Sequence, residues 1–512
     1  MTVESYDELP YSSRVYHGTH PRQIAAIGKL LGLDVADIDG CRVLEIGCGT
    51  GGSLISCATS LPGGRFVGVD YSQHQIDIAQ SVVEGLGIDN IEFLQKNILE
   101  IDVSFGEFDY IIAHGIYSWV PEEVKNKLME VCKQNLSEKG VAYVSHNTYP
   151  GAYYLLKVRD MMLYHVRNIT DTQERVDAAR KFFSFMLESV PLSSTVQGAV
   201  LKKLRSVLDI TDDSYLAHEY LDIFNEPVLF HKIADDAADL GLQYLGDADF
   251  IRRQFDEFPH DTWDSICSFG ESVVEQEQYG DFVKDIMFRK TLFCHAGKPL
   301  NETIEQANMK GVYVSALSHF QEVVDNSAEK YKNDTGASID IRHPVLRVVM
   351  RHLVNTRPMA ASFDELCETV VQQKISLSDD VIDQLKIWLL RAYSNGFIEL
   401  SADNPVPKLE VDNYPKASSF SRFQAKSGPD VINLCHQNAR LNTFAMYLLP
   451  FLDGTENLEG LVNKMAHLQS EGVLEDIKFS ASSVGKEGNR EHLESEVSKN
   501  LNLMAKWALL VN

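Results

Sequence analysis

The chain has 512 residues, with 47 Lys and Arg against 73 Asp and Glu, so its formal net charge at pH 7 is −26. At about 150 residues per domain, this length predicts two to four domains, and the acidic excess disfavours binding to nucleic acid or to an anionic membrane through bulk charge. A hydrophobic content of 44% with 23% charged residues is typical of a globular protein and excludes global disorder.

The N-terminus and the cysteines bear on cellular location. The first residues, MTVESYDELPY, are acidic and polar, unlike a signal peptide, and no apolar run approaches the roughly 18 residues that span a bilayer. The eight cysteines form no C-x-x-C motif, so we expect reduced thiols in a cytoplasmic protein without membrane insertion. Cys294-His295 and Cys435-His436 each place two potential ligands side by side, but adjacent residues rarely close a tetrahedral site, and no metal is expected.

Alternating strands and helices are predicted for the first third of the chain. Helical periodicity is found in residues 20–33 and again in residues 72–88, where Ser72 is the expected N-cap. Five short apolar runs give the rhythm of an open, doubly wound parallel sheet, whose ligands are expected at the carboxyl ends of the strands. The runs occupy residues 42–46, 66–69, 91–94, 108–113 and 141–145.

The segment VLEIGCGTGGSL, residues 43–54, joins the first predicted strand to a helix. Glycines let the backbone turn tightly and approach a ligand without interference from Cβ atoms, so we expect a cofactor against Gly47, Cys48, Gly49 and Gly52. The same residues satisfy G-x-G-x-x-G, which alone is a weak signature of dinucleotide binding. Binding of NAD therefore has to be weighed against binding of S-adenosylmethionine (SAM).

Polar residues at the ends of the first three strands favour SAM. Glu45 stands where a dinucleotide-binding strand is normally apolar, and a buried carboxylate needs a partner, which the ammonium of a methionine supplies and a pyrophosphate does not. Asp70, with Tyr71 beside it, is placed to accept the ribose hydroxyls of either cofactor. Asn97 and Ile98 follow the third strand, where an amide and a backbone group can read an adenine edge. Asp70 and Asn97 can also be plain turn residues.

With these residues in place, the sequence resembles the class I SAM-dependent methyltransferases, whose motif I matches CRVLEIGCGTGGSL. The segments RFVGVDYSQHQI, AHGIYSWVP, SHNTYPGAY, EQYGDFVKDIMFRKTLFCH and SSFSRFQAKSG resemble the members that carry a methyltransferase regulatory domain. That group includes the rickettsial protein-lysine methyltransferases of outer membrane protein B. The resemblance covers most of the chain. Ser53, His146 and Ala152 stand where the group commonly or often has Asn, Tyr and Trp.

The resemblance implies an α/β fold with a Rossmann-like, seven-stranded class I methyltransferase sheet and a helical insertion, followed by C-terminal winged-helix-like α+β domains. The predicted parts are a SAM-binding core with strands one to five (1–152), a helical insertion over the active site (153–224), a return to the sheet with strands six and seven (225–298), a helical, winged-helix-like domain (299–400) and a C-terminal winged-helix-like domain (401–512).

Local patterns support several of these parts. In residues 153–224 a stripe at spacings of three and four is expected to be core packing. The polar stretch 326–342 predicts a linker or a long loop, and Ser362 with Glu365 predicts a capping box. The segment SDDVIDQLKIWLLRAYSNG carries no basic stripe, which favours protein contact or dimerisation over DNA binding.

The resemblance places methyl transfer in the loop His114–Pro121. We assign Tyr117, Trp119 and Tyr149 to an aromatic, water-poor slot for an acceptor amine, although Trp119 and Tyr149 can instead pack the ends of the sheet. His114 is expected to touch the methionine part of the cofactor, to relay a proton, or to be only hydrogen-bonded to backbone. A second wall is expected from Asn147, Tyr149, Pro150 and Gly151.

Two further segments are expected near this site. His218 and Glu219 are candidates to point from the helical insertion toward the acceptor, or are a plain pair at a helix end. The resemblance also suggests that the segment with Tyr6, Pro10 and Tyr11 folds over the cofactor as a lid, or is an ordered tail.

The function expected from these observations is a SAM-dependent methyltransferase that methylates lysine side chains of a protein. Methylation of a small molecule and SAM binding by a regulatory protein without turnover are the alternatives, and NAD-dependent hydride transfer ranks last. The partner is then a lysine-containing protein or a small-molecule acceptor, with no nucleic acid, and a homodimer is a further prediction.

Overall fold

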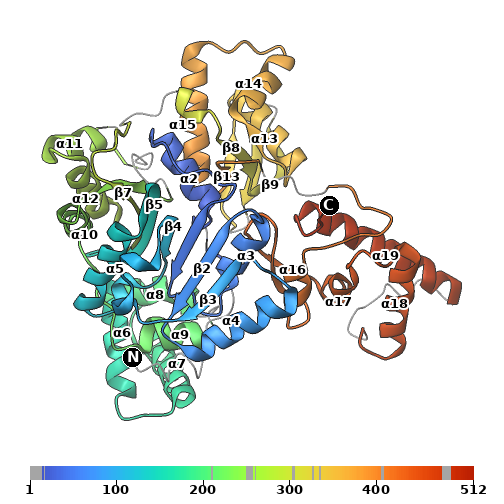
Figure 1. Cartoon of the computed structure of the whole chain (residues 1–512), viewed down its shortest axis with the longest axis horizontal. Coiled ribbons are helices and arrows are strands. Elements are labelled where there is room, and N and C mark those ends of the chain that lie inside the picture. The colour runs from blue at the N-terminus through green and yellow to red at the C-terminus, as the bar shows by residue number, and fades with distance from the viewer. Residues whose placement is uncertain are drawn as a thin grey trace.

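A mixed seven-stranded sheet lies at the centre of the computed structural model, with helices on both faces and two further units beside it (Figure 1). The structure describes residues 14–16, 18–208, 212–249, 258–259, 261–301, 306–325, 328–333, 336–404, 409–474 and 486–511. The lid predicted from Tyr6, Pro10 and Tyr11 lies outside the described residues.

The strands of the central sheet are β1 (Arg42–Ile46), β2 (Arg65–Asp70), β3 (Ile91–Gln95), β4 (Phe108–Ala113), β5 (Leu136–Asn147), β6 (Leu242–Asp247) and β7 (Phe288–His295). Their order is β3-β2-β1-β4-β5-β7-β6. β1 to β5 pair in parallel, whereas β7 runs antiparallel to both β5 and β6. This confirms the predicted class I methyltransferase sheet, including the return of two late strands to it.

Neighbouring residues of β1 point into two separate cores, because successive side chains of a strand face opposite sides. Val43 packs with the helices α2 (Pro21–Leu30), α3 (Gly52–Ser60) and α4 (Gln73–Leu86). Leu44 packs on the other face with α5 (Glu122–Gln134) and α10 (Phe230–Asp239). The predicted N-cap of α4 is confirmed, since Ser72 Oγ accepts the backbone N–H of Gln75 at 3.1 Å.

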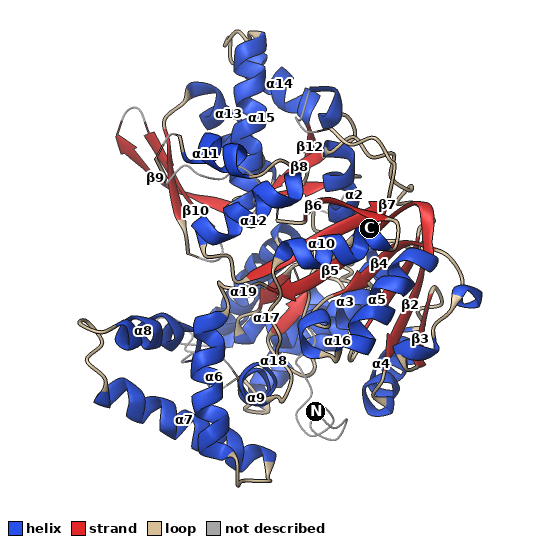
Figure 2. Cartoon of the chain, turned by 90° about the vertical axis from the view of Figure 1, so that its left-hand side faces the viewer, coloured by secondary structure: helices blue, strands red, loops and turns tan. Residues whose placement is uncertain are grey.

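The helical insertion is formed by α6 (Tyr153–Val166), α7 (Thr172–Ser189), α8 (Val196–Leu208) and α9 (Asp213–Leu221). These helices project from the sheet and share a core of their own (Figure 2). The stripe of α7 is core packing as predicted, with Val176, Ala179 and Phe183 buried. Among the described residues, none of the helices combines the length and apolar character needed to cross a membrane.

After the insertion, α11 (Thr262–Phe269) and α12 (Val273–Lys284) precede β7. The first C-terminal unit has a sheet in the order β12-β8-β13, built from β8 (Tyr313–Ala316), β12 (Ala361–Ser362) and β13 (Ile398–Ser401), with α13 (Pro344–Thr356), α14 (Phe363–Gln372) and α15 (Asp379–Ser394). The capping box of Ser362 and Glu365 is confirmed at the start of α14.

The second unit contains α16 (Ser419–Gln424), β14 (Asp430–Ile432), β15 (Asn438–Arg440), α17 (Thr443–Leu448), α18 (Leu458–Ser470) and α19 (Lys486–Lys506). The first unit contacts α2 through β13, and the second contacts α3 through α16 (Figure 1). The predicted boundaries at residues 152, 224, 298 and 400 stay predictions.

The prediction of a linker or loop at residues 326–342 is wrong. Most of the described residues there form β10 (Ala328–Asn333) and β11 (Ser338–Ile341), which join β9 (Ser318–Asp325) in an antiparallel sheet. Tyr331 is buried in β10, and the buried Glu329 is neutralised by Arg347 and Arg351 of α13, with Arg347 Nη2 lying 3.1 Å from its carboxylate. This polar strand is therefore stabilised by charges that come from another element.

Candidate active site

The glycine-rich turn after β1 lies against the end of β2. The N–H groups of Gly47 and Cys48 donate to Val69 O at 2.8 and 3.1 Å. Gly51 caps α3 with φ +77°, and a Cβ atom there would come within 2.3 Å of the Phe93 ring, so only glycine fits. Gly52 begins α3. The turn thus leaves its backbone at the carboxyl edge of the sheet, where a ligand of a parallel sheet is expected.

Asp70 holds this turn through its carboxylate. The N–H of Gly49 donates to Asp70 Oδ2 and the N–H of Ser72 donates to Asp70 Oδ1, both at 2.9 Å. The carboxylate therefore stands directly beside the glycine turn, as the predicted ribose contact requires. Tyr71, the next residue, is exposed, and its carbonyl accepts a hydrogen bond from Gln95 Nε2 at 3.1 Å.

Glu45 is a buried carboxylate in need of a cation. It is 6% exposed, and its Oε2 atom accepts no hydrogen bond from the described residues. Burial, and then the charge of Asp70, raise the pKa of Glu45 to about 8. A buried unpartnered carboxylate is costly, so this oxygen fits a ligand ammonium such as the amino group of a methionine.

The predicted adenine contacts lie at the end of β3. Asn97 is half-buried, and its Oδ1 atom accepts the N–H of Leu99 at 3.0 Å, which caps a short 3₁₀ helix (Ile98–Glu100). Ile98 is half-buried in that helix. The side-chain oxygen of Asn97 thus accepts a hydrogen bond within its own turn. The roles of Asn97 and Ile98 toward an adenine stay predictions.

His114, at the end of β4, lies in an aromatic environment. Its Nδ1 atom is 2.9 Å from the Tyr143 hydroxyl, its ring lies 4.1 Å from that of Tyr16 and its ring is 5.9 Å from that of Phe288. Burial, and then the positive charge of Lys290, lower the pKa of His114 to about 3. A base with so low a pKa accepts a proton poorly near pH 7, which favours a contact role over the proton-relay role.

The three rings assigned to the aromatic slot make no ring contact with one another among the described residues. Tyr117 is buried in the core on the α5 side of the sheet and lies edge-on to His146 at 6.1 Å. Trp119 is half-buried. Tyr149 is 45% exposed and contacts Tyr153 edge-on at 6.3 Å. Tyr117 therefore packs the core, and the catalytic assignment of the three rings stays a prediction.

The second wall is linked to the segment that follows α9. The N–H of Asn147 donates to Ser118 Oγ at 2.8 Å, and Asn147 Nδ2 donates to Asn225 Oδ1 at 2.9 Å. Asn225 Nδ2 is buried with no hydrogen-bond acceptor among the described residues. Asn225 was not selected from the sequence; the available signal was a polar residue directly after the predicted helical insertion (153–224). Gly151 packs closely against Ile286, since a Cβ atom there would lie 2.0 Å from Ile286 O.

Tyr16, from outside the sheet, lies beside His114. Burial is the largest cause of a raised pKa of Tyr16, and the negative charge of Glu219 in α9 is the next. His218, its neighbour, is buried in α9. The charge of Glu219 therefore acts on Tyr16, and its role toward an acceptor stays a prediction. Tyr16 was missed by the sequence analysis, because a lone tyrosine before a helix has no distinctive pattern.

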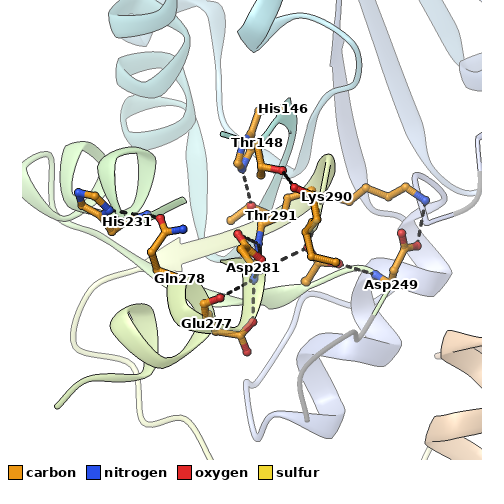
Figure 3. A network of polar contacts seen from close by, with 12 residues as sticks. His146, Thr148, His231, Asp249, Glu277, Gln278, Asp281, Lys290 and Thr291 are labelled. Carbon is orange, nitrogen blue, oxygen red and sulfur yellow. Dashed lines mark hydrogen bonds and ion pairs between the residues drawn. The ribbon is translucent and has the colours of Figure 1, made fainter. Parts of the chain in front are cut away.

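A buried charge network lies behind the second wall, on the side of β7 that faces α12 (Figure 3). Arg289 donates to Asp281 at 2.7 Å and to Glu277 at 2.9 Å, and its Nη1 atom lies 3.7 Å from Asp247. His146 Nε2 lies 3.0 Å from Thr291 Oγ1 on the same strand as Arg289. The network locks α12, β6 and β7 against the end of β5, which carries the second wall.

The segment with Tyr16 is attached to the second C-terminal unit. The N–H of Val15 donates to Asn438 Oδ1 at 3.2 Å, and Asn438 Nδ2 donates to Val15 O at 2.9 Å. Asn438 is the first residue of β15. A residue of the C-terminal unit thus holds the backbone that places Tyr16 on His114.

Replacing Asn438 by alanine is expected to loosen this segment. Loss of two hydrogen bonds of about 0.5–1.5 kcal/mol each weakens docking by about 1–3 kcal/mol, so amide hydrogen exchange at Val15 should become roughly tenfold faster or more. Arg440→Ala, on the same strand, is the control and should leave this exchange unchanged. Equal exchange at Val15 in Asn438→Ala and the unmodified chain would show that other contacts hold the segment.

Family models match three parts of the chain. A methyltransferase domain matches residues 37–202, a predicted methyltransferase regulatory domain matches residues 212–295, and a PKMT, C-terminal winged helix domain matches residues 413–509. The glycine turn and Asp70 lie in the first of these regions, whereas Glu219, Asn225 and Arg289 lie in the second.

Known proteins resemble the chain over its whole length. Uncharacterized protein RP789 of Rickettsia prowazekii is 31% identical, over 99% of this chain and 93% of that protein. The solved structure of PKMT2 from Rickettsia typhi has a TM-score of 0.86 at 26% identity, covering 98% of this chain and 100% of that chain. A second structure of PKMT2, in complex with AdoHcy, has a TM-score of 0.85 with the same coverage.

Proposed function

The chain belongs to the family of class I methyltransferases that carry a regulatory domain and a PKMT-type C-terminal winged helix domain, and from this premise we propose that it transfers methyl groups from SAM to lysine side chains of a protein. The observation that carries the proposal is the similarity to PKMT2 over 98% of this chain, C-terminal units included. Methyltransferases of many substrates share the sheet alone, so similarity of the added units is the more specific support.

The residues at the carboxyl edge of the sheet fit SAM. Glu45 Oε2, which has no hydrogen-bond partner among the described residues, would accept the ammonium of the methionine part. Asp70 would accept the ribose hydroxyls beside the turn of Gly47, Cys48 and Gly49. Tyr71, Asn97 and Ile98 would surround the adenine. SAM supplies a methyl group activated by a positive sulfur; the AdoHcy in the PKMT2 complex is the product that such a transfer leaves.

Transfer to an amine requires its lone pair. The S–C bond breaks with its electrons passing to sulfur, while the lysine nitrogen forms the new N–C bond and loses a proton to solvent. A lysine with a pKa near 10.4 must first lose a proton at a cost of about 4.6 kcal/mol at pH 7. Alignment and exclusion of water are then the main tasks of the protein.

The residues predicted to line the acceptor site are suited to these tasks. Trp119 and Tyr149 offer aromatic faces that attract a cation before its proton leaves. Glu219, near Tyr16, adds a negative charge that recruits a lysine. A net charge of −26 also favours encounter with a lysine-rich substrate. The low pKa of His114 leaves its ring neutral, so it adds no charge that would repel the sulfur cation.

Labelled SAM tests the proposal. Incubation of the full chain with SAM carrying a tritiated methyl group and a cell lysate is expected to place label in precipitable protein, and hydrolysis of that protein should release methylated lysine. Asp70→Ala is the matched control, because it removes the carboxylate that holds the turn, and should lower incorporation roughly a hundredfold or more.

Other outcomes would support other functions. Label found only in small molecules would indicate a small-molecule methyltransferase, and SAM binding without any transfer would indicate a regulatory protein; either result contradicts the proposal. A cytoplasmic location and a homodimer stay predictions, which fractionation of cells and sedimentation of the purified chain would test.

A further inference from the structure

Three potential metal ligands meet where the methyltransferase sheet contacts the second C-terminal unit. His20 precedes α2, Cys57 lies in α3, and His436 lies in the loop between β14 and β15. All three are buried, and their ligand atoms lie within 4.8 Å of one another. We propose that this cluster binds a zinc ion, which joins the C-terminal unit to α2 and α3.

Hydrogen bonds orient the ring of His436 for such a role. Thr19 Oγ1 donates to Tyr16 O at 2.8 Å, so its oxygen is left to accept a hydrogen bond from the N–H of His436 Nε2, 3.3 Å away. The lone pair of His436 is then on Nδ1, which lies 3.9 Å from Cys57 Sγ and 3.0 Å from Ser56 Oγ. A metal-binding histidine normally donates its other N–H to a neighbour, as His436 does to Thr19.

His20 can join the set by exchanging one hydrogen bond. Its Nδ1 atom accepts the N–H of Arg22 at 3.1 Å, and its Nε2 atom lies 3.0 Å from Ser60 Oγ. Ser60 Oγ itself donates to Cys57 O at 3.0 Å, so its oxygen accepts a hydrogen bond from the N–H of His20 Nε2. Binding through Nδ1 keeps this donation to Ser60 and replaces only the bond from Arg22.

The loop that carries His436 has an unusual backbone. His436 has φ +57°, a left-handed conformation that a residue with a side chain seldom adopts. Asn433 supports it, since its Oδ1 atom accepts the N–H groups of Cys435 and Gln437, both at 2.9 Å. Non-glycine residues in this conformation concentrate at functional sites, where the surroundings maintain them. Here the conformation aims the imidazole at α3.

The geometry and chemistry suit zinc. Bonds of about 2.3 Å to sulfur and about 2.0 Å to nitrogen place tetrahedral ligand atoms about 3.5 Å apart. The ligand atoms lie within 4.8 Å of one another, so the three side chains need to approach by up to roughly 1.3 Å. Thiolate and imidazole are preferred ligands of Zn²⁺. Binding forms a Zn–S bond as the Cys57 thiol releases its proton to solvent, and Ser56 or water completes the coordination. From the sequence no metal was expected, because the adjacent pair Cys435-His436 had no further ligand at metal spacing. The cysteine of this cluster, Cys57, lies 379 residues before His436.

Metal analysis of the purified full chain tests the site. After removal of metals with a chelator and dialysis against Zn²⁺, about one ion per chain is expected. Cys57→Ala and His436→Gln should each weaken binding roughly a hundredfold or more. Cys435→Ser, which changes the neighbouring thiol outside the cluster, and Cys132→Ala, which changes a buried thiol elsewhere, should bind as the unmodified chain does.

Cobalt provides a second measurement. Co²⁺ added to the metal-free chain should give the charge-transfer absorption of a thiolate ligand, and Cys57→Ala should lose it. Zn²⁺ should raise the unfolding temperature of the unmodified chain but not of Cys57→Ala. If the unmodified chain binds neither ion, or if Cys57→Ala and His436→Gln bind as tightly as the unmodified chain, the cluster is a metal-free set of hydrogen bonds and the proposal is overturned. None of these measurements depends on methyl transfer.

Discussion

Binding of SAM is expected to tighten by about tenfold for each unit as the pH rises from 6 toward 8. Burial and the charge of Asp70 raise the pKa of Glu45 to about 8, so the carboxyl is protonated in the free protein below that pH. An ammonium needs the ionised form, and binding below pH 8 must therefore expel one proton. The affinity gain ends near pH 8, where Glu45 is ionised and the ligand amino group, with a pKa of about 8, loses its own charge.

Glu45→Gln separates this effect from other titrations. The variant should bind SAM roughly ten- to hundredfold more weakly at pH 8, since a hydrogen bond to a charged group is lost, and its affinity should no longer rise between pH 6 and 8. Glu84→Gln, on the exposed side of α4, is the control. Calorimetric titration at several pH values gives both quantities. A rise that persists in Glu45→Gln would assign the proton to another group.

Arg289→Ala is expected to destabilise the chain by about 3–5 kcal/mol, because removal of one partner from a buried ion pair leaves buried charge uncompensated. The carboxylates of Glu277, Asp281 and Asp247 all face this guanidinium, which is among the most buried large side chains. The loss of stability should concentrate in α12, β6 and β7.

Amide hydrogen exchange, resolved for individual peptides, is the measurement, since a chain with several units need not unfold in one step. Peptides of β7 should exchange at least about a hundredfold faster in Arg289→Ala. Arg440→Ala removes an exposed pair with Asp430 and should cost at most about 1 kcal/mol. Unchanged exchange in β7 of Arg289→Ala would mean that the carboxylates take up protons at little cost.

Much of the sheet could be predicted because its strands are short, apolar and bounded by turn residues. The runs predicted at residues 42–46 and 108–113 coincide with β1 and β4. The failure at residues 326–342 has a physical cause. β10 buries Glu329 against arginines of a later helix, so its burial depends on charges that no local hydrophobic pattern reveals.

The residues of the candidate site also divide into those that local sequence reveals and those that depend on distant parts of the chain. Glu45, the glycine turn and Asp70 are adjacent to strand ends, so local sequence was enough to select them. Asn225 reaches Asn147 across 78 residues and Tyr16 reaches His114 from another segment, and such contacts depend on the packing of the whole chain. The burial of Tyr117 depends equally on α10, which follows it by more than one hundred residues.

The pair of hydrogen bonds between Val15 and Asn438 has a consequence for the order of assembly during synthesis. The glycine turn and its sheet can form soon after the ribosome has released β7. Tyr16 can settle on His114 with this support only after β15 (Asn438–Arg440) has emerged, which follows the end of β7 at His295 by 438 − 295 = 143 residues. A nascent chain would thus acquire a place for its nucleoside before its catalytic surroundings are finished.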